Sequence, residues 1–283
     1  MSKVFIAMLL IATTATTAHA GTPFPVDPFL QPFRPVAGTD DLFALRFNPS
    51  GLGRTSDVEM GWFHHYTKQG PGGNNAIVLR MKNAAASINW IEDPLRGNRR
   101  EYLLGIGNPV TPSLFFGTNY RYIKADDSLL QNRHTWTHSV LFAPSPAWSL
   151  GARWENPWHT EVGGVKTDGT ITAGLQVTPI PNRLEAAMDW VYPEKERLDD
   201  TRLIWSAIFH ATPGIDVNGF FGTDNRFGVE LRIMIDRSAA GNQMRYTSPG
   251  GWQDGTFYIS ILQRNYDHAK IPRRGPVRYS LAP

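Results

Sequence analysis

The chain has 283 residues, 28 Lys and Arg against 25 Asp and Glu, a formal net charge of +3, and no cysteine. The lack of cysteine excludes a disulfide framework, a thiolate nucleophile and a cysteine-ligated metal site. The charges are interspersed rather than gathered in basic blocks, so the sequence gives no indication of a nucleic-acid partner.

The first twenty residues have the pattern of an export signal. MSKVFIAMLLIATTATTAHA contains one early lysine, an apolar run from Val4 to Ala12, and small residues at Ala18 and Ala20. We therefore predict a secretory signal peptide over residues 1–20, cleaved near Ala20. The alternative is a membrane helix, but the apolar run is far shorter than the ~20 residues that such a helix needs.

Residues 21–56 form a predicted proline-rich arm that leads into a short apolar segment. The stretch 21–36 carries five prolines and no periodicity, which favours an extended conformation. Asp40 or Asp41 is expected to cap a short helical turn through Leu42–Phe47, which Asn48 and Pro49 then end. The apolar side chains of this turn need a place of burial.

The remainder of the chain alternates between apolar and polar residues. In residues 148–155 apolar side chains occupy every second position and small or polar ones lie between them. This is the pattern of a strand with one apolar face and one polar face. From Asp57 onward the sequence shows fourteen such segments: 57–66, 75–82, 85–92, 99–108, 113–124, 134–143, 147–156, 169–178, 183–191, 201–211, 214–222, 225–236, 240–248 and 255–264.

The connections between these segments alternate in length. Short proline-bearing turns hold Pro112, Pro146, Pro181 and Pro213, and longer polar connections occupy 125–133, 157–168 and 192–200. Outer-membrane barrels have short periplasmic turns and longer external loops. The pattern therefore predicts an all-β, antiparallel transmembrane β-barrel over residues 57–264, with about fourteen strands and both strand termini on the periplasmic side. Loss of one hairpin among the weakest segments would leave twelve strands.

Charged residues fall on the face opposite the apolar stripe, and we predict that they line the lumen. A soluble propeller is the alternative fold, but its core would have to bury these charges at high cost. The predicted lumen residues are Arg121, Arg153, Glu155, Glu185, Asp189, Arg202, Glu230 and Arg232.

A short motif before the first strand carries a family resemblance. DLFALRFNPSGLG, residues 41–53, resembles the N-terminal segment of the FadL and PorV-like outer-membrane families, with Ser50 in place of the usual alanine. The resemblance implies a barrel plugged from the periplasmic side by the N-terminal segment. In those families the FadL branch moves hydrophobic molecules, and the PorV branch serves protein export and surface attachment. The implied plug or gate residues are Asn48, Pro49, Ser50, Gly51 and Leu52; the alternative is a plain lead-in to the first strand.

No catalytic motif or metal-ligand spacing is present, so we expect a non-enzyme without a cofactor. His64 and His65 point to opposite faces of a strand, and His134 and His138 lie roughly 13 Å apart at ~3.3 Å per residue. The nine tryptophans mostly fall near strand ends, where they favour membrane anchoring over ligand binding.

Two functional hypotheses follow for a protein of the Gram-negative outer membrane. The first is a passive channel for small hydrophobic molecules, gated by the N-terminal segment. The second is a non-transporting barrel that anchors a periplasmic or secreted partner through the basic tail, residues 265–283. That tail is similar to the junction in long signal-peptide-peptidase-like proteins, where a barrel-like region precedes a protease domain.

Overall fold

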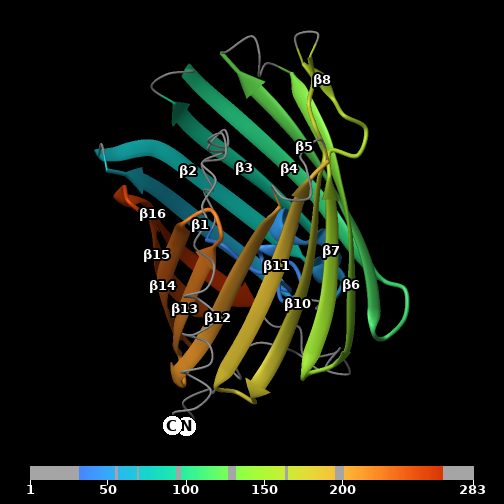
Figure 1. Ribbon diagram of the computed structural model, residues 1–283, viewed down its shortest axis with the longest axis vertical. Coiled ribbons are helices and arrows are strands. Elements are labelled where there is room, and N and C mark those ends of the chain that lie inside the picture. Colours follow the sequence, from blue (N-terminus) through green and yellow to red (C-terminus); the bar gives the residue numbers. More distant parts are fainter. Residues whose placement is uncertain are drawn as a thin grey trace.

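Fourteen antiparallel strands close into a single barrel in the computed structural model (Figure 1). The structure describes residues 32–54, 57–68, 70–93, 97–126, 132–162, 165–194 and 201–263. Each barrel strand pairs with its neighbours in the sequence, and β1 pairs with β16 to close the ring. The predicted fold class is confirmed, with fourteen strands rather than twelve.

The strand bounds follow the predicted segments closely. The largest differences are at β2 and β16, which begin five and four residues before the predicted starts at 75 and 255. The barrel strands are β1 (Val58–Thr67), β2 (Gly70–Met81), β3 (Ala84–Asp93), β4 (Gly97–Pro109), β5 (Leu114–Ala125), β6 (Arg133–Ser145), β7 (Trp148–Glu155), β10 (Thr170–Ile180), β11 (Leu184–Pro193), β12 (Arg202–Thr212), β13 (Ile215–Gly222), β14 (Arg226–Ile235), β15 (Ser238–Thr247) and β16 (Gly251–Gln263).

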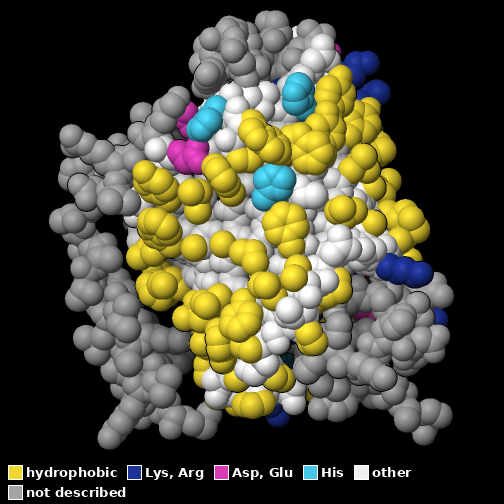
Figure 2. All heavy atoms as spheres, turned by 90° about the vertical axis from the view of Figure 1, so that its right-hand side faces the viewer, with side chains coloured by type: hydrophobic (Ala, Val, Ile, Leu, Met, Phe, Trp, Pro, Cys, Tyr) yellow, Lys and Arg dark blue, Asp and Glu magenta, His cyan; other side chains and the backbone are white. Residues whose placement is uncertain are grey.

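The outer surface of the barrel is apolar and the inner surface is polar. On β14, Val229 and Leu231 expose 50% and 48% of their surface, while Glu230 between them exposes 1%. Figure 2 shows hydrophobic side chains spread over the outer face of the wall. Because a strand alternates its side chains between two faces, the sequence pattern alone is enough to produce this inverted distribution.

The two ends of the barrel differ in their connections. At one end, which we call the turn end, the strands are joined by connections of two to four residues. Val58 and Gln263 pair at this end, so both termini of the barrel lie there. At the opposite loop end, the connection after β7 contains a small hairpin of β8 (Glu161–Val162) and β9 (Val165–Lys166), which the sequence pattern did not predict.

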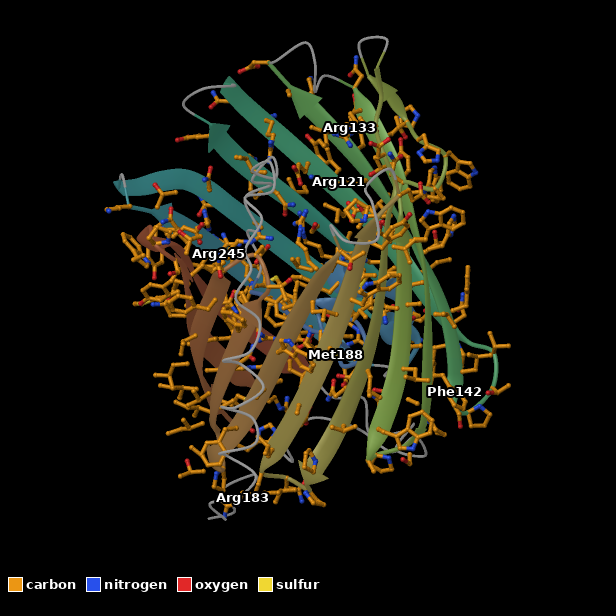
Figure 3. All side chains as sticks on the ribbon, in the orientation of Figure 1. Arg121, Arg133, Phe142, Arg183, Met188 and Arg245 are labelled. Carbon is orange, nitrogen blue, oxygen red and sulfur yellow. The ribbon has the colours of Figure 1, made fainter. Side chains whose placement is uncertain are left out.

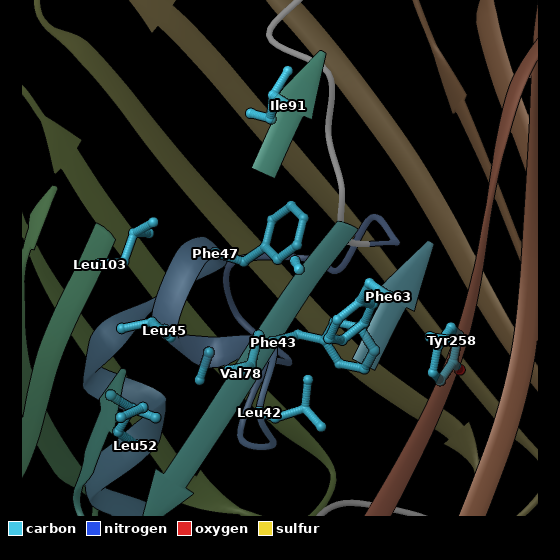
Figure 4. Close-up of a cluster of buried hydrophobic side chains, with 13 residues drawn as sticks. Leu42, Phe43, Leu45, Phe47, Leu52, Phe63, Val78, Ile91, Leu103 and Tyr258 are labelled. Carbon is cyan, nitrogen blue, oxygen red and sulfur yellow. The ribbon is translucent and has the colours of Figure 1, made fainter. Parts of the chain in front are cut away.

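The N-terminal segment, residues 32–54, lies inside the barrel. It contains the helix α2 (Ala44–Phe47) and the 3-10 helix η1 (Pro49–Arg54). The helix begins later than predicted, and the predicted aspartate cap is wrong in detail: the cap position is Phe43, while Asp41 accepts the Phe43 N–H at 3.0 Å. The principal hydrophobic cluster joins this segment to the inner wall (Figure 4).

The predicted signal peptide, most of the proline-rich arm and the basic tail lie outside the described residues. These three predictions concern residues 1–31 and 264–283. Within the described ranges, no helix is both long and apolar enough to cross a membrane.

A charge placed on the outer face should destabilise the barrel according to its depth. Leu231→Arg, in the middle of β14, is expected to cost about 2–4 kcal/mol, whereas Ile235→Arg at the strand end should cost about 1 kcal/mol or less. Urea unfolding of the protein in liposomes measures both values. Equal costs at the two positions would contradict a lipid-facing outer wall.

Candidate functional site

The N-terminal segment is held by hydrogen bonds from strands all around the barrel. On one side the Phe33 N–H donates to Gln243 Oε1 at 3.0 Å, and the Leu42 N–H donates to Glu59 Oε2 at 3.1 Å. On the other side the Asn119 side-chain amide donates to the Leu45 carbonyl at 2.6 Å. The segment therefore crosses the lumen from wall to wall.

The five predicted plug residues form a compact buried turn beside β4, β5 and β6. The Asn48 side-chain amide donates to the Val36 carbonyl, which ties the turn to the preceding chain, and the Ser50 N–H donates to Ser139 Oγ at 2.8 Å. Asn48, Ser50 and Leu52 are completely buried. The structure thus brings these residues together in the lumen, and their gating role stays a prediction.

Inward-facing glycines let the segment approach the barrel backbone. A Cβ on Gly117 would lie 2.2 Å from the Pro49 carbonyl carbon and the Ser50 nitrogen, and one on Gly107 would lie 2.4 Å from the Pro49 carbonyl oxygen. A Cβ on Gly151 would lie 2.6 Å from the Val36 carbonyl oxygen. Since real Cβ contacts essentially never fall below 3.0 Å, these positions admit only glycine while the segment stays in place.

Four of the eight predicted lumen residues contact this segment directly. The Val36 N–H donates to Asp189 at 3.0 Å, and Arg153 donates to the Arg46 carbonyl at 3.0 Å. Arg232 lies 3.7 Å from the carboxylate of Asp41 in the segment. The fourth residue, Glu230, makes the most extensive contact.

Glu230 is the centre of a buried polar cluster that we call the Glu230 clasp, formed by Arg34, Glu230 and Tyr258. Arg34 donates to both carboxylate oxygens, with one contact of 2.8 Å, and the Tyr258 hydroxyl donates at 2.6 Å. The Arg34 guanidinium also lies 4.3 Å from the centre of the Phe43 ring. A bidentate, charge-assisted contact of this kind fixes both the position and the orientation of Arg34.

The other four predicted lumen residues also face inward, and they contact other residues of the wall or of its connections. Arg121 contacts Glu101 at 2.7 Å and Glu155 at 3.9 Å. Arg202 lies 3.9 Å from Asp224. Glu185 accepts a hydrogen bond from Gln176 and lies 3.4 Å from His210, which in turn contacts Asp216 at 2.6 Å.

Several site residues were missed by sequence reasoning. Glu59, Arg80 and Glu101 stand on the inward register of β1, β2 and β4, so a stricter reading of the alternation would have found them. Tyr258 shares the inward face of β16 with Thr256 and Ser260, so the same reading would have found it, although an aromatic residue suits the lipid face equally well. Arg34 lies in the proline-rich arm, where no pattern indicates its partner.

The lumen has an apolar side, to which the segment itself contributes Phe33 and Phe47, and a cationic side. On the apolar side the ring centres of Phe33 and Phe220 are 4.9 Å apart, and those of Phe33 and Phe47 are 6.0 Å apart. The neighbouring β12 residues Ile204 and Ile208 pair with inward-facing wall positions. The cationic side has four arginines on successive strands, of which Arg121 and Arg133 are labelled in Figure 3: Arg99, Arg121, Arg133 and Arg153. The two carboxylates of Glu101 and Glu155 stand among them.

Similar solved structures are outer-membrane-type barrels at low sequence identity. The CymD monoaromatic hydrocarbon channel matches with a TM-score of 0.53 and 10% identity, over 82% of this chain and 95% of CymD. The toluene transporter TbuX of Ralstonia pickettii matches with a TM-score of 0.53 and 12% identity, over 83% of this chain and 99% of TbuX. No protein-family model matches the sequence, and no curated protein matches it either.

These likenesses support the fold and are consistent with the expected non-enzyme, since the two similar proteins are named as a channel and a transporter. The resemblance of residues 41–53 to the FadL and PorV-like families stays a prediction.

One acidic residue of the segment has a strongly altered environment. Burial, the largest cause, and the neighbouring Asp41 carboxylate raise the pKa of Asp40, whereas Arg54 and Arg80 lower it, and the net pKa is about 6. Asp40 lies 3.2 Å from Arg54. A carboxyl group whose pKa is higher in the folded state stabilises that state at low pH, and the stabilisation is lost as the pH rises through about 6.

Filling the space of an inward glycine should displace the segment. Gly117→Val is expected to destabilise the protein by about 1–3 kcal/mol, because the new side chain overlaps the Pro49–Ser50 backbone. Gly219→Val is the matched control, since a Cβ there meets no atom closer than 3.9 Å. Urea unfolding and protease cleavage within residues 32–54 provide the measurements. Equal behaviour of the two variants would mean that the segment is not packed against β5.

The Asp40 environment predicts a specific pH dependence. Between pH 4 and pH 7, Asp40→Asn should gain roughly 2–3 kcal/mol of stability relative to the wild type, because the wild type loses the contribution of its protonated carboxyl. The difference between the two unfolding curves, measured at each pH, isolates this residue from other titrating groups. A constant difference would contradict the raised pKa.

Proposed function

We propose that this protein is a passive outer-membrane channel for small hydrophobic or amphipathic molecules, gated by its N-terminal segment. The observation that carries the proposal is the half-buried apolar surface of the lumen, where Phe33 of the segment meets Phe220 of the wall. A pore for ions or sugars gains nothing from such a surface, whereas an apolar solute does.

The opposite, cationic side of the lumen suggests how such a solute is oriented. The side chains of Arg121 and Arg153 are 11% and 15% exposed, and they lie on the inner face of the wall beside Glu155. An amphipathic molecule with a polar or anionic group would place that group toward the arginines and its apolar part toward Phe33 and Phe220. The substrate class is therefore small molecules with a substantial apolar surface.

The segment must move or open for a solute to pass, and the two halves of the segment are held differently. Residues 48–54 touch the wall through backbone packed against glycines, which leaves no room for adjustment. Residues 33–42 also pack backbone against Gly151, but their polar contacts to the wall are made to side chains, among them Glu230, Asp189 and Glu59. Side-chain contacts can exchange partners with water or solute, so we propose that residues 33–42 move while residues 48–54 stay anchored.

Two engineered disulfides test this division, because the chain has no cysteine of its own. Ser149 Oγ donates to the Ala37 carbonyl at 2.6 Å, so Ala37→Cys with Ser149→Cys would tie the first half to β7. Uptake of a hydrophobic fluorescent probe into liposomes should fall to the level of protein-free liposomes when this pair is oxidised. Reduction should restore uptake.

The control ties down the half that we expect to stay in place. Ser50→Cys with Ser139→Cys joins η1 to β6, where the Ser50 N–H already contacts Ser139 Oγ at 2.8 Å. Its oxidised form should conduct as the reduced form does. If both oxidised proteins conduct normally, movement of the segment is not needed for passage, and the gating proposal is wrong.

A further inference from the structure

The outer wall at β2–β6 combines a groove with two exposed basic residues, and both features lie outside the lumen. The groove has a volume of about 530 Å³ and is almost entirely apolar. Its floor is made by Ala84 and Ala86, and its walls by Leu79, Leu104, Tyr120 and Trp136. The small alanines between larger neighbours explain why the surface is hollow here.

Arg100 and Lys124 stand above this groove, at the loop end of β4 and β5. The two residues are directly opposite each other in the strand register, and both are exposed on the outer face. Like charges in directly opposed positions destabilise a sheet. Among the described residues, neither side chain has a recorded salt bridge or hydrogen bond.

Among the described residues, no carboxylate at this rim forms a salt bridge with Arg100 or Lys124. Asp126 Oδ2 accepts the Asn98 N–H at 3.2 Å, and Glu92 is opposite Asn98 in the register rather than opposite Arg100. Within the described rim, the basic pair is therefore a place where an anion would relieve repulsion between two cations.

Between the basic pair and the groove lies a band of aromatic side chains. Tyr102 and Tyr122, the next outward pair below Arg100 and Lys124, stack with ring centres 6.2 Å apart. Tyr120 and Trp136 follow, 5.0 Å apart, and they form part of the groove wall. Tyrosine and tryptophan favour the level of the lipid head groups, so this band indicates where the hydrocarbon layer begins. Figure 2 shows the apolar outer face with Lys and Arg side chains at its upper right edge.

We propose that this surface is a binding site for a single phosphate-headed lipid of the leaflet at the loop end. The phosphate contacts Arg100 and Lys124, and one acyl chain passes the Tyr102–Tyr122 stack and lies in the groove over Ala84 and Ala86. The order of charge, aromatic band and apolar groove down one face matches the order of head group, interface and chain in a lipid. From Arg100 to Leu104 the strand runs roughly 13 Å along its own axis at ~3.3 Å per residue, a distance that an acyl chain spans easily. The inference rests on the membrane placement in the proposed function, but not on transport.

The test measures lipid binding to the purified full-length protein in detergent by native mass spectrometry. The probe is dihexadecanoyl phosphatidic acid, and we expect one tightly bound molecule. Arg100→Gln with Lys124→Gln should weaken this binding by roughly 10- to 30-fold, since each basic residue near a membrane surface contributes roughly three- to fivefold. Ala86→Phe, which fills the groove without removing charge, should also weaken it.

The control removes two exposed basic residues elsewhere. Lys68→Gln with Arg237→Gln changes the net charge equally and should leave binding unchanged. Phosphatidylcholine has acyl chains and a phosphate but no net negative charge, and inorganic phosphate has the charge but no acyl chain. Each should therefore bind far more weakly than phosphatidic acid. Heat-dependent gel migration confirms that every variant retains the barrel.

Unchanged binding by the Arg100→Gln, Lys124→Gln protein would overturn the proposal, and so would equal binding of phosphatidylcholine. Binding of inorganic phosphate as strong as that of the lipid would reduce the site to an anion site and would also overturn it. Probe uptake in liposomes is measured on the same variants. Because the site is outside the lumen, uptake can fail while lipid binding holds, or the reverse.

Discussion

The structure depends on the need to pair every backbone polar group of a wall that faces hydrocarbon. Lipid offers no hydrogen-bond partner, so an open sheet edge within the membrane would leave a row of N–H and C=O groups unsatisfied. The pairing of β1 with β16, from Val58 opposite Gln263 to Thr67 opposite Asp254, removes both edges at once. Closure in turn fixes which face of each strand points into the lumen, and hence which charged side chains line it.

Closure creates a second problem, because a polar-lined lumen must be filled either by water or by protein. In this protein the turn-end part is filled by the chain itself. Leu42, Phe43 and Leu45 are completely buried although they lie inside the barrel rather than between two layers of secondary structure. The barrel therefore has an apolar exterior facing lipid and a separate apolar core within its lumen. Polar inward-facing residues of the wall, among them Glu230, Asp189 and Glu59, surround that core.

The sequence was sufficient to predict most of the barrel, for a reason that lies in strand geometry. The two-residue period identifies both faces of a strand wherever side chains differ in polarity, as on β14. The period fails where a stretch is rich in glycine or has side chains of similar polarity. Residues 70–75 read GPGGNN, so the start of β2 has no alternation to detect. All eight predicted lumen charges face inward because each was assigned by register rather than by residue type.

Contacts between the segment and the wall could not be predicted in the same way. Arg34 and Glu230 are separated by 196 positions in the chain, and no periodicity relates an irregular arm to a strand. Tyr258 and Phe63 lie inside the barrel although their side chains suit lipid equally well; what places them inside is the register of β16 and β1 and the apolar segment that they cover. Pairing partners across the lumen depend on the path of the segment, which the sequence leaves open.

The two kinds of contact that hold the segment have different physical consequences. The segment backbone is packed against Gly107 and Gly117, and this close packing resists displacement. Water or a solute cannot take the place of such a contact. The Glu230 clasp is held by charge and hydrogen bonds, and its energy depends on how well water is excluded. A solute or water that reaches Arg34 from the loop end competes directly with Glu230 for the guanidinium. Under the proposed gating, one end of the segment would stay fixed as a seal while the other end responds to the contents of the lumen, without any change in the strands.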